Sequence, residues 1–481
     1  MDKILFNTLE KHQNHISFHT PGHSGRLELP LNLDATMIPN SNDGSDLGLL
    51  ELPLNLDATM VPHSNDGGDL GLFKKLELPL NFDITELTYS DNLLNPTGPI
   101  KAMQENISEA YGVDNMFLLS SGATTGVQIA ITSSKLKEPF LILEPAHKSI
   151  FRSLQMINAK AYVLKRIDDL AYHEIGIYPD KVYEEIEDAL NKTKAKTLIL
   201  TSPNYFGNII CDEKIKRIKD KYNINIILDA AHGSHFPFSP KLPKLNTKIY
   251  DYVIFSMHKT LPVLTGGAGI AVKNKDKDSV KITLQDLHST SPSYLTLLSI
   301  EQAVSTYLEN GNTLYNKVFS DIENFKKALS DDYAFVESDD KTRVVIEAPN
   351  GNIATKKLEE NEIFIEMTYD NFLVLIVTPF NSMHLEKVSK ILNSIKYPSL
   401  PFIEKWQGKP KYDLIELKFT NNYEMVLPKD AVGKVAYREF GIYPPGVPLV
   451  YSGQIITKEN IDLLENNDVF GLIDGKILIK K

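Results

Sequence analysis

The 481-residue sequence predicts an α/β protein with a mostly parallel β-sheet flanked by helices and a smaller C-terminal α/β domain. Two observations support this fold class. Short apolar runs alternate with segments of helical periodicity over residues 116–261, and the alternation resumes over residues 331–395. Glycine-rich or polar turns follow the apolar runs, at the points where parallel strands should end.

Composition narrows the class of protein. A net charge of −11 and a pI near 5.6 argue against nucleic acid as the main partner, because no basic stripe is available to neutralise phosphates. Cys211 is the single cysteine, which excludes an intrachain disulfide and a cysteine-based zinc cluster, and no other metal site is expected. The N-terminus lacks a secretory signal and no apolar run is long enough to span a membrane, so we expect a cytoplasmic protein.

The N-terminal segment, residues 1–90, contains an unusual duplication. Residues 27–49 and 50–72 are nearly identical, and a partial third copy begins at Leu76. Two complete copies are too few to bury the core of a solenoid. We therefore interpret residues 27–75 as a duplicated insertion within an exposed loop.

The elements of the large domain, expected at residues 91–325, follow in order. The predicted strands cover residues 116–120, 140–143, 161–165, 197–201, 224–228 and 252–255. The predicted helices begin at residues 127 and 149 and cover 180–190 and 212–222. Because ligands of such sheets bind beyond the carboxyl ends of the strands, the turns after the strands are the candidate site.

Two further regions complete the predicted organisation. After a hydroxyl-rich loop at residues 289–294, a long helix should run to about Glu309, and a small α/β domain should cover residues 326–400. The proline-rich residues 398–410 resemble a linker to a C-terminal domain at 401–481. Within that domain, Thr457 is expected to cap a final helix.

The turn after the first predicted strand has the composition of an anion site. Gly122, Ala123 and Thr124 lie between a strand and a helix, where backbone N–H and hydroxyl groups converge. The pattern is neither a dinucleotide-binding fingerprint nor a Walker loop. Ser256 and His258, at the end of another predicted strand, offer further donors for a phosphate.

Lys259 suggests which phosphate-bearing group would bind. A lysine at a strand end beside phosphate donors suits a Schiff base with pyridoxal phosphate. The carboxylate of Asp229, at another strand end, could keep the pyridine nitrogen protonated, and the ring of His147 could stack on the pyridine face. An isolated lysine of this kind would more often be a solvated loop residue, so the argument depends on these companions.

These residues lie within motifs that resemble the ornithine/lysine/arginine decarboxylases of pyridoxal phosphate fold type I, in their short form without a receiver-like N-terminal domain. The motifs occur in family order and extend over nearly the whole chain except the insertion. They are H-T-P-G-H (19–23), D-I-T-E-L (83–87), N-P-T-G-P-I-K-A (95–102), S-G-A-T-T-G (121–126), A-H-K-S (146–149), S-P-N-Y-F-G (202–207), L-D-A-A-H-G-S-H-F (228–236), S-M-H-K-T-L (256–261), S-T-S-P-S-Y (289–294) and Y-P-P-G-V-P-L (443–449).

The resemblance implies a role for each candidate residue. It makes Lys259 the Schiff-base lysine, Asp229 the partner of the pyridine nitrogen and His147 the stacking ring, with His232 near the cofactor. The residues that it places around the phosphate are Gly122, Ala123, Thr124, Ser256 and His258. The sequence departs from the family pattern at Ala230, where a carboxylate is frequent, and at Gly266, where a glutamine is frequent. Ala230 removes a charge near the site and leaves the substrate preference open.

The implied reaction is decarboxylation of a basic L-amino acid, which belongs to polyamine biosynthesis. Arginine, giving agmatine and CO2, is the favoured substrate because short-form members are commonly assigned that activity; lysine and ornithine remain alternatives. Either Lys259 or His147 could return the proton to the α-carbon. The resemblance also implies a homodimer or a higher homo-oligomer.

Two other functions fit parts of the sequence. An aminotransferase needs the same lysine and aspartate, and Arg343, at the start of a small-domain strand, could clamp its substrate's α-carboxylate. A non-catalytic paralogue that binds pyridoxal phosphate would be consistent with the insertion near the H-T-P-G-H motif. The presence of Lys259, Asp229 and His147 argues against the second alternative.

Overall fold

The computed structural model describes the backbone of residues 16–18 and residues 83–87, 89–134, 137–166, 178–397, 411–442, 448–465 and 469–481. Several predicted features fall outside the described residues. They are the H-T-P-G-H motif at 19–23, the insertion at 27–75, the linker at 398–410 and residues 443–447 of the C-terminal motif. The predictions for these segments therefore stay predictions.

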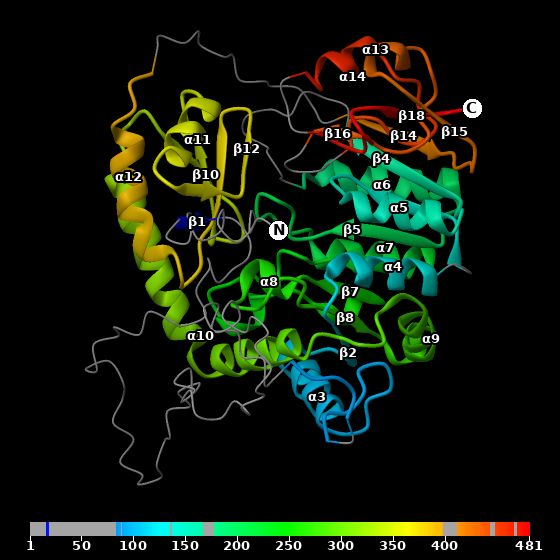
Figure 1. The fold of residues 1–481 in the computed structure, drawn as a ribbon, viewed down its shortest axis with the longest axis horizontal. Coiled ribbons are helices and arrows are strands. Elements are labelled where there is room, and N and C mark those ends of the chain that lie inside the picture. Colours follow the sequence, from blue (N-terminus) through cyan, green and yellow to red (C-terminus); the bar gives the residue numbers. More distant parts are fainter. Residues whose placement is uncertain are drawn as a thin grey trace, which may run out of the picture. The chain divides into compact units, whose positions relative to one another are not determined.

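The large domain is built on an eight-stranded sheet with the strand order β14-β4-β3-β5-β6-β7-β8-β2 (Figure 1). Its strands are β2 (Asn115–Leu119), β3 (Phe140–Leu143), β4 (Ala161–Arg166), β5 (Thr197–Thr201), β6 (Asn225–Asp229), β7 (Tyr252–Phe255), β8 (Ala268–Val272) and β14 (Tyr412–Leu417). Strands β4, β3, β5, β6 and β7 are parallel. Both β7 and β2 are antiparallel to β8, so β2 has the same direction as the parallel strands. The predicted convergence of the strand ends is thereby confirmed.

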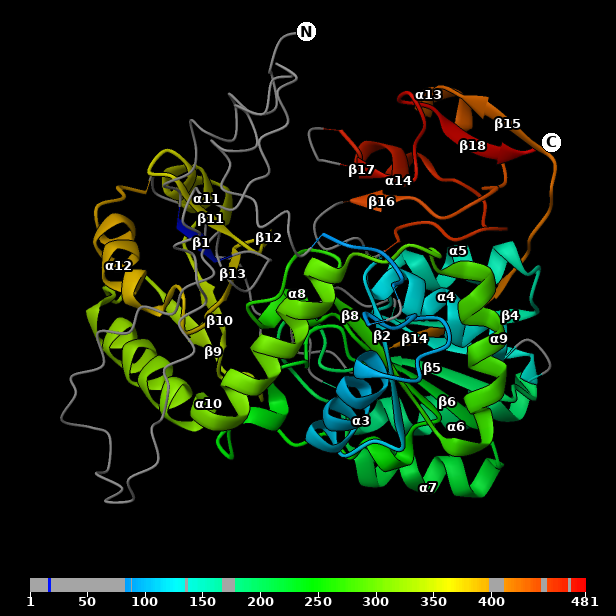
Figure 2. The same cartoon turned by 60° about the horizontal axis from the view of Figure 1, so that its bottom comes forward.

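Helices cover both faces of this sheet. They are α3 (Pro99–Tyr111), α4 (Ala123–Ser133), α5 (Lys148–Met156), α6 (Asp180–Thr193), α7 (Asp212–Tyr222), α8 (Met257–Thr260) and α9 (Lys277–Leu287). Figure 2 shows α4, α5 and α9 on one face and α6 and α7 on the other. The prediction placed the start of α4 at Val127, but the helix already begins at Ala123. The residues predicted as a turn therefore form its first turn, and Gly122 is the turn residue that precedes it.

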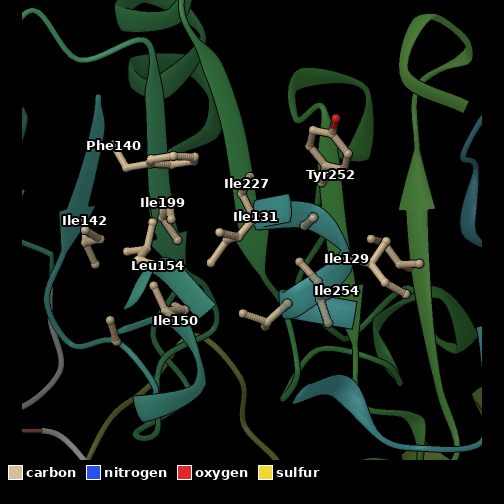
Figure 3. Packing of buried hydrophobic residues seen from close by; sticks show 14 of the residues in the cluster. Ile129, Ile131, Phe140, Ile142, Ile150, Leu154, Ile199, Ile227, Tyr252 and Ile254 are labelled. Carbon is tan, nitrogen blue, oxygen red and sulfur yellow. The ribbon is translucent and has the colours of Figure 1, made fainter. Parts of the chain in front are cut away.

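The core between the sheet and helices α4 and α5 is almost entirely aliphatic (Figure 3). Ile129 of α4 and Leu154 of α5 are fully buried, as is Ile199 of β5. Each such side chain contributes about 1.5–3 kcal/mol by leaving water. Strand β5 is buried at every position, which explains its continuous apolar sequence. This core holds the first turns of α4 and α5 at the carboxyl edge of the sheet.

A second, antiparallel sheet forms the small domain, with the order β12-β13-β10-β9. Its strands are β9 (Ala334–Val336), β10 (Arg343–Glu347), β12 (Met367–Tyr369) and β13 (Phe372–Ile376), and its helices are α11 (Gly351–Glu359) and α12 (Leu385–Asn393). Strand β11 (Ile363–Ile365) pairs in parallel with β1 (Ile16–Phe18) from the N-terminal segment, a pairing that the sequence did not suggest.

The long helix α10 (Tyr294–Ala328) precedes this sheet and extends well beyond the predicted end at Glu309. Gly311 explains the difference, because a glycine in a helical pattern resembles a stop. A Cβ atom at Gly311 would lie 2.4 Å from the carbonyl oxygen of Phe238. The glycine therefore allows close packing of α10 and does not end it.

The C-terminal region contributes to two structures. Strand β14 joins the large sheet by antiparallel pairing with β4, whereas the rest forms a small cluster with its own apolar core. That cluster contains β15 (Tyr423–Val426), β16 (Gly441–Ile442), β17 (Val469–Phe470), β18 (Ile477–Lys480), α13 (Pro428–Ala431) and α14 (Lys458–Asp462). The predicted cap is confirmed, since the Thr457 side chain accepts a hydrogen bond from the Asn460 N–H. Among the described helices, none has the length and apolar character needed to cross a membrane.

Candidate active site

Lys259 lies at the carboxyl edge of the large sheet, within the short helix α8 that follows β7 (Figure 1). Its Nζ atom is 3.0 Å from Nε2 of His232. Asp229 is the last residue of β6, is 5% exposed and accepts a hydrogen bond from the Ala231 N–H at 3.1 Å. The structure thus brings Lys259 to His232, which lies 27 positions earlier in the same motif as Asp229.

Burial dominates the electrostatics of this group. It lowers the pKa of Lys259, which the charge of Arg343 lowers further and the carboxylates of Glu366 and Asp229 raise. It raises the pKa of Asp229, although Lys259 and the Ala231 N–H oppose the rise. Burial also lowers the pKa of His232 far below its ordinary value, which the charges of Lys259 and Arg343 reinforce. Burial thus favours the uncharged form of the lysine, the aspartate and the histidine alike.

A glycine loop joins the two predicted phosphate-binding turns. The Gly122 N–H donates to the Gly266 carbonyl oxygen at 2.7 Å, and the His258 N–H donates to the neighbouring Gly267 carbonyl oxygen at 3.1 Å. The turn that carries Gly122 therefore lies beside the turn that carries Ser256 and His258. Among the residues that the structure describes, no side chain caps the N-terminus of α4, and Gly122 itself has a φ of 85°.

The His258 ring completes this set of donors. Its Nδ1 atom lies 3.1 Å from the Gly267 carbonyl oxygen, a contact that requires a proton on Nδ1. The Ser256 hydroxyl, which is buried, lies 3.4 Å from the same Nδ1. Gly122, Ala123 and Thr124 thus lie at the start of α4, and Ser256 and His258 lie on the adjacent turn. That these residues bind a phosphate stays a prediction.

The departure at Gly266 has a structural explanation. Its φ is 97°, and a Cβ atom would lie 2.8 Å from the Ser120 carbonyl oxygen. A glutamine would therefore not fit this loop conformation. Ala230 is fully buried, and its N–H donates to the Ile254 carbonyl oxygen at 2.9 Å.

His147 caps α5 at the end of β3 and contributes to the electrostatics of the same site. Its Nδ1 atom accepts a hydrogen bond from the Ser149 N–H at 3.2 Å, so the proton of the neutral ring lies on Nε2. Burial, together with the charges of Lys259 and Lys148, lowers its pKa to about 3. The ring is therefore uncharged throughout the neutral pH range.

Arg343 enters the site from the small domain, and the decarboxylase interpretation of the sequence did not include it. It is 2% exposed, and its Nη2 atom lies 2.9 Å from Nδ1 of His232. Its Nε and Nη1 atoms have no hydrogen-bond partner among the described residues. An arginine that opens an otherwise apolar strand was the available signal, but sequence alone could not supply the partner.

Residues around Arg343 and His232 restrict their positions. A Cβ atom at Gly207, whose φ is 87°, would lie 2.7 Å from Cβ of Arg343, so only glycine leaves room for that side chain. The Tyr205 ring contacts the His232 ring edge-on at 5.4 Å. Tyr205 and Gly207 belong to the S-P-N-Y-F-G motif, whose contribution to the site the sequence did not specify.

Comparisons with known proteins agree with this arrangement. The sequence model described as "Orn/Lys/Arg decarboxylase, major domain" matches residues 77–347. An uncharacterised protein, YaaO, of Bacillus subtilis (strain 168) is 28% identical over 79% of this chain and 84% of its own length. An arginine decarboxylase of the same organism is 27% identical over 79% and 84% of the two chains. The constitutive lysine decarboxylase of E. coli superposes with a TM-score of 0.66 at 17% identity, over 89% of this chain and 81% of that one, which confirms the predicted fold.

Proposed function

Because the chain belongs to the Orn/Lys/Arg decarboxylase family, we propose that it decarboxylates L-arginine to agmatine and CO2, with Lys259 as the reacting amine. At the coarser level the chain is an amino acid decarboxylase that depends on pyridoxal phosphate. The observation that supports Lys259 as the reacting amine is its partly buried contact with His232, near Asp229 and inside the matched region.

The residues present fit pyridoxal phosphate. The open N-terminus of α4 at Gly122 and the adjacent Ser256 and His258 would hold its phosphate, and the carboxylate of Asp229 would pair with its ring nitrogen. When bound, the cofactor supplies an electron-withdrawing ring that stabilises the negative charge left on the substrate's α-carbon. The raised pKa of buried Asp229 is consistent with a carboxylate that lacks its cationic partner.

Two side chains could move the proton that replaces the carboxylate. Burial lowers the pKa of Lys259, which favours an amine that can accept a proton and return it to the α-carbon. Neutral His147 carries its proton on Nε2 and is the second candidate donor.

Arginine is favoured over lysine by the comparison of sequences. The relative named arginine decarboxylase of Bacillus subtilis is 27% identical over 79% of this chain, whereas the relative named lysine decarboxylase of Hafnia alvei is 22% identical over 78%. The Glu366 carboxylate, close enough to raise the pKa of both Lys259 and Arg343, offers a negative charge on the small-domain side for a cationic substrate. On the basis of the family resemblance, we also propose that the protein is a cytoplasmic homo-oligomer that acts in polyamine biosynthesis.

The proposal is tested by incubating the purified full chain and pyridoxal phosphate with arginine, lysine and ornithine separately, and measuring CO2 and amines. We expect agmatine as the main product. Lys259→Ala should lower its formation by at least about a thousandfold and abolish the visible imine absorbance. Arg217→Met, on the exposed face of α7, is the matched control and should retain both. Keto acids without amines, or an unchanged spectrum in Lys259→Ala, would refute the assignment.

A further inference from the structure

His232 is placed between two side chains that normally donate hydrogen bonds. Arg343 Nη2 lies 2.9 Å from its Nδ1, and Lys259 Nζ lies 3.0 Å from its Nε2. Arg343 and His232 are buried, at 2% and 3% exposed, and Lys259 is half-buried. The direction of each hydrogen bond therefore decides which protons this line of groups can hold.

The arginine determines the direction. A guanidinium has only donors and keeps its charge, so Nδ1 of His232 must be the acceptor. The proton of the neutral imidazole then lies on Nε2 and points at Lys259. An ammonium group has no lone pair to accept it, whereas a neutral amine does. The arrangement is satisfied only when Lys259 is a neutral amine.

We propose that Arg343 is a positioning residue that acts through His232: it fixes the imidazole proton on Nε2, and this hydrogen bond keeps Lys259 as a neutral amine. The inference rests on the proposed function only in taking Lys259 as the reacting group. Gly207 is part of the same device, because its missing Cβ leaves the space through which the stem of Arg343 reaches His232.

Other charged groups also act on Lys259, and the proposal has to be separated from them. Those whose charge influences Lys259, or is influenced by it, come from several elements: Asp229 of β6, His147 at the start of α5, His258 of α8, Arg343 of β10 and Glu366 beside β12. Arg343 could lower the basicity of Lys259 simply by its positive charge across space. Only the path through His232 makes its effect depend on the imidazole.

The test measures the reactivity of Lys259 in the full chain freed of cofactor. Trace labelling with acetic anhydride, read by mass spectrometry of the peptide that carries Lys259, reports the neutral amine as a function of pH. In Arg343→Met, His232 can carry its proton on Nδ1 and accept from an ammonium, so the labelling midpoint should rise. A rise of one pH unit is about a tenfold lower labelling rate below the midpoint.

A double-mutant cycle with His232→Phe separates the two paths. We expect Arg343→Met to change the labelling rate much less in the His232→Phe background than in the natural chain. An equal change in both backgrounds would show a direct charge effect and overturn the proposed action through His232. An unchanged midpoint in Arg343→Met would also overturn it. If Arg343→Met does not fold, His232→Phe alone decides, since losing the donor should also raise the midpoint. Arg217→Met is the control for reagent and charge.

Because labelling needs neither cofactor nor substrate, failure of this inference is distinguishable from failure of the proposed function. If the chain forms agmatine but Arg343→Met does not shift the labelling midpoint, the proposed function stands and the role of Arg343 through His232 is overturned. If the midpoint shifts but no amine forms, the role of Arg343 stands and the proposed function is overturned.

Discussion

Two buried aspartates on neighbouring strands of the large sheet differ in how they are satisfied. Asp229 ends β6 at the carboxyl edge, whereas Asp251 directly precedes β7 at the opposite edge, since the two strands are parallel. They are 5% and 1% exposed. Similar burial in the same sheet would suggest similar roles, yet their surroundings are opposite.

Asp251 is surrounded by donors. Lys219 and Lys275 approach its carboxylate at 2.6 and 2.8 Å, and the Ile226 N–H donates to it at 2.8 Å. Burial alone would raise the pKa of Asp251, but these hydrogen bonds hold it below its ordinary value. For Asp229, the Ala231 N–H and the charge of Lys259 do not offset burial, and the pKa is raised. The carboxylate of Asp251 is thus charge-paired within the protein, whereas burial disfavours the charge of Asp229, which suits Asp229 to a cationic group of a ligand.

The largest expected difference between the two aspartates is in activity. Asp229→Asn should lower the kcat of decarboxylation by at least about a hundredfold, because an amide cannot hold the cofactor's ring nitrogen protonated. Asp251→Asn should leave the kcat of the folded enzyme within about twofold, because it lies at the opposite edge. Steady-state amine formation at saturating cofactor measures both. Similar losses in the two variants would contradict the division into structural and functional aspartates.

Much of this division could be predicted from the sequence. Asp229 was found because it ends an apolar run, and Lys259 because it follows another, so the strand pattern alone placed both at one edge. Arg343 was considered only as a clamp in the aminotransferase alternative, because its contact with His232 joins residues 111 positions apart. Strand β8 was missed because three of its five residues are glycine or alanine, which are depleted in strands, although it pairs antiparallel with β2. These missed features depend on contacts between residues distant in sequence, which local propensities do not encode.

The next largest effect is on stability, where the two Asp→Asn substitutions should change the free energy of unfolding in opposite directions. Asp251→Asn should lower the free energy of unfolding by about 3–5 kcal/mol near pH 7, because it leaves buried lysine charge without its partner. Asp229→Asn should raise it by about 1 kcal/mol, because it removes a carboxylate that burial penalises. Urea unfolding of the cofactor-free chain measures both changes.

The pH dependence of these stability changes provides an internal control. The folded pKa of Asp251 is lowered, so its contribution is complete above the unfolded pKa and is lost as pH falls through the folded pKa. The deficit of Asp251→Asn should therefore stay constant from pH 8 to 5. The folded pKa of Asp229 is raised, so the advantage of Asp229→Asn should disappear as pH falls through that higher value. A constant advantage down to pH 4 would show that Asp229 is not under-satisfied.

The smallest effect distinguishes the two lysines that satisfy Asp251. The Lys219 side chain is 16% exposed and also donates to the Ile249 carbonyl oxygen at 2.6 Å, whereas the Lys275 side chain is 57% exposed. Lys219→Met should therefore lower the free energy of unfolding by about 2 kcal/mol, since it leaves two buried acceptors with fewer donors. Lys275→Met should cost less than about 0.5 kcal/mol, because solvent screens the exposed pair. Equal costs in urea unfolding would mean that Asp251 depends on charge alone. A larger cost for Lys219 would show that buried hydrogen bonds make this edge of the sheet structural, in contrast to the edge that carries Asp229.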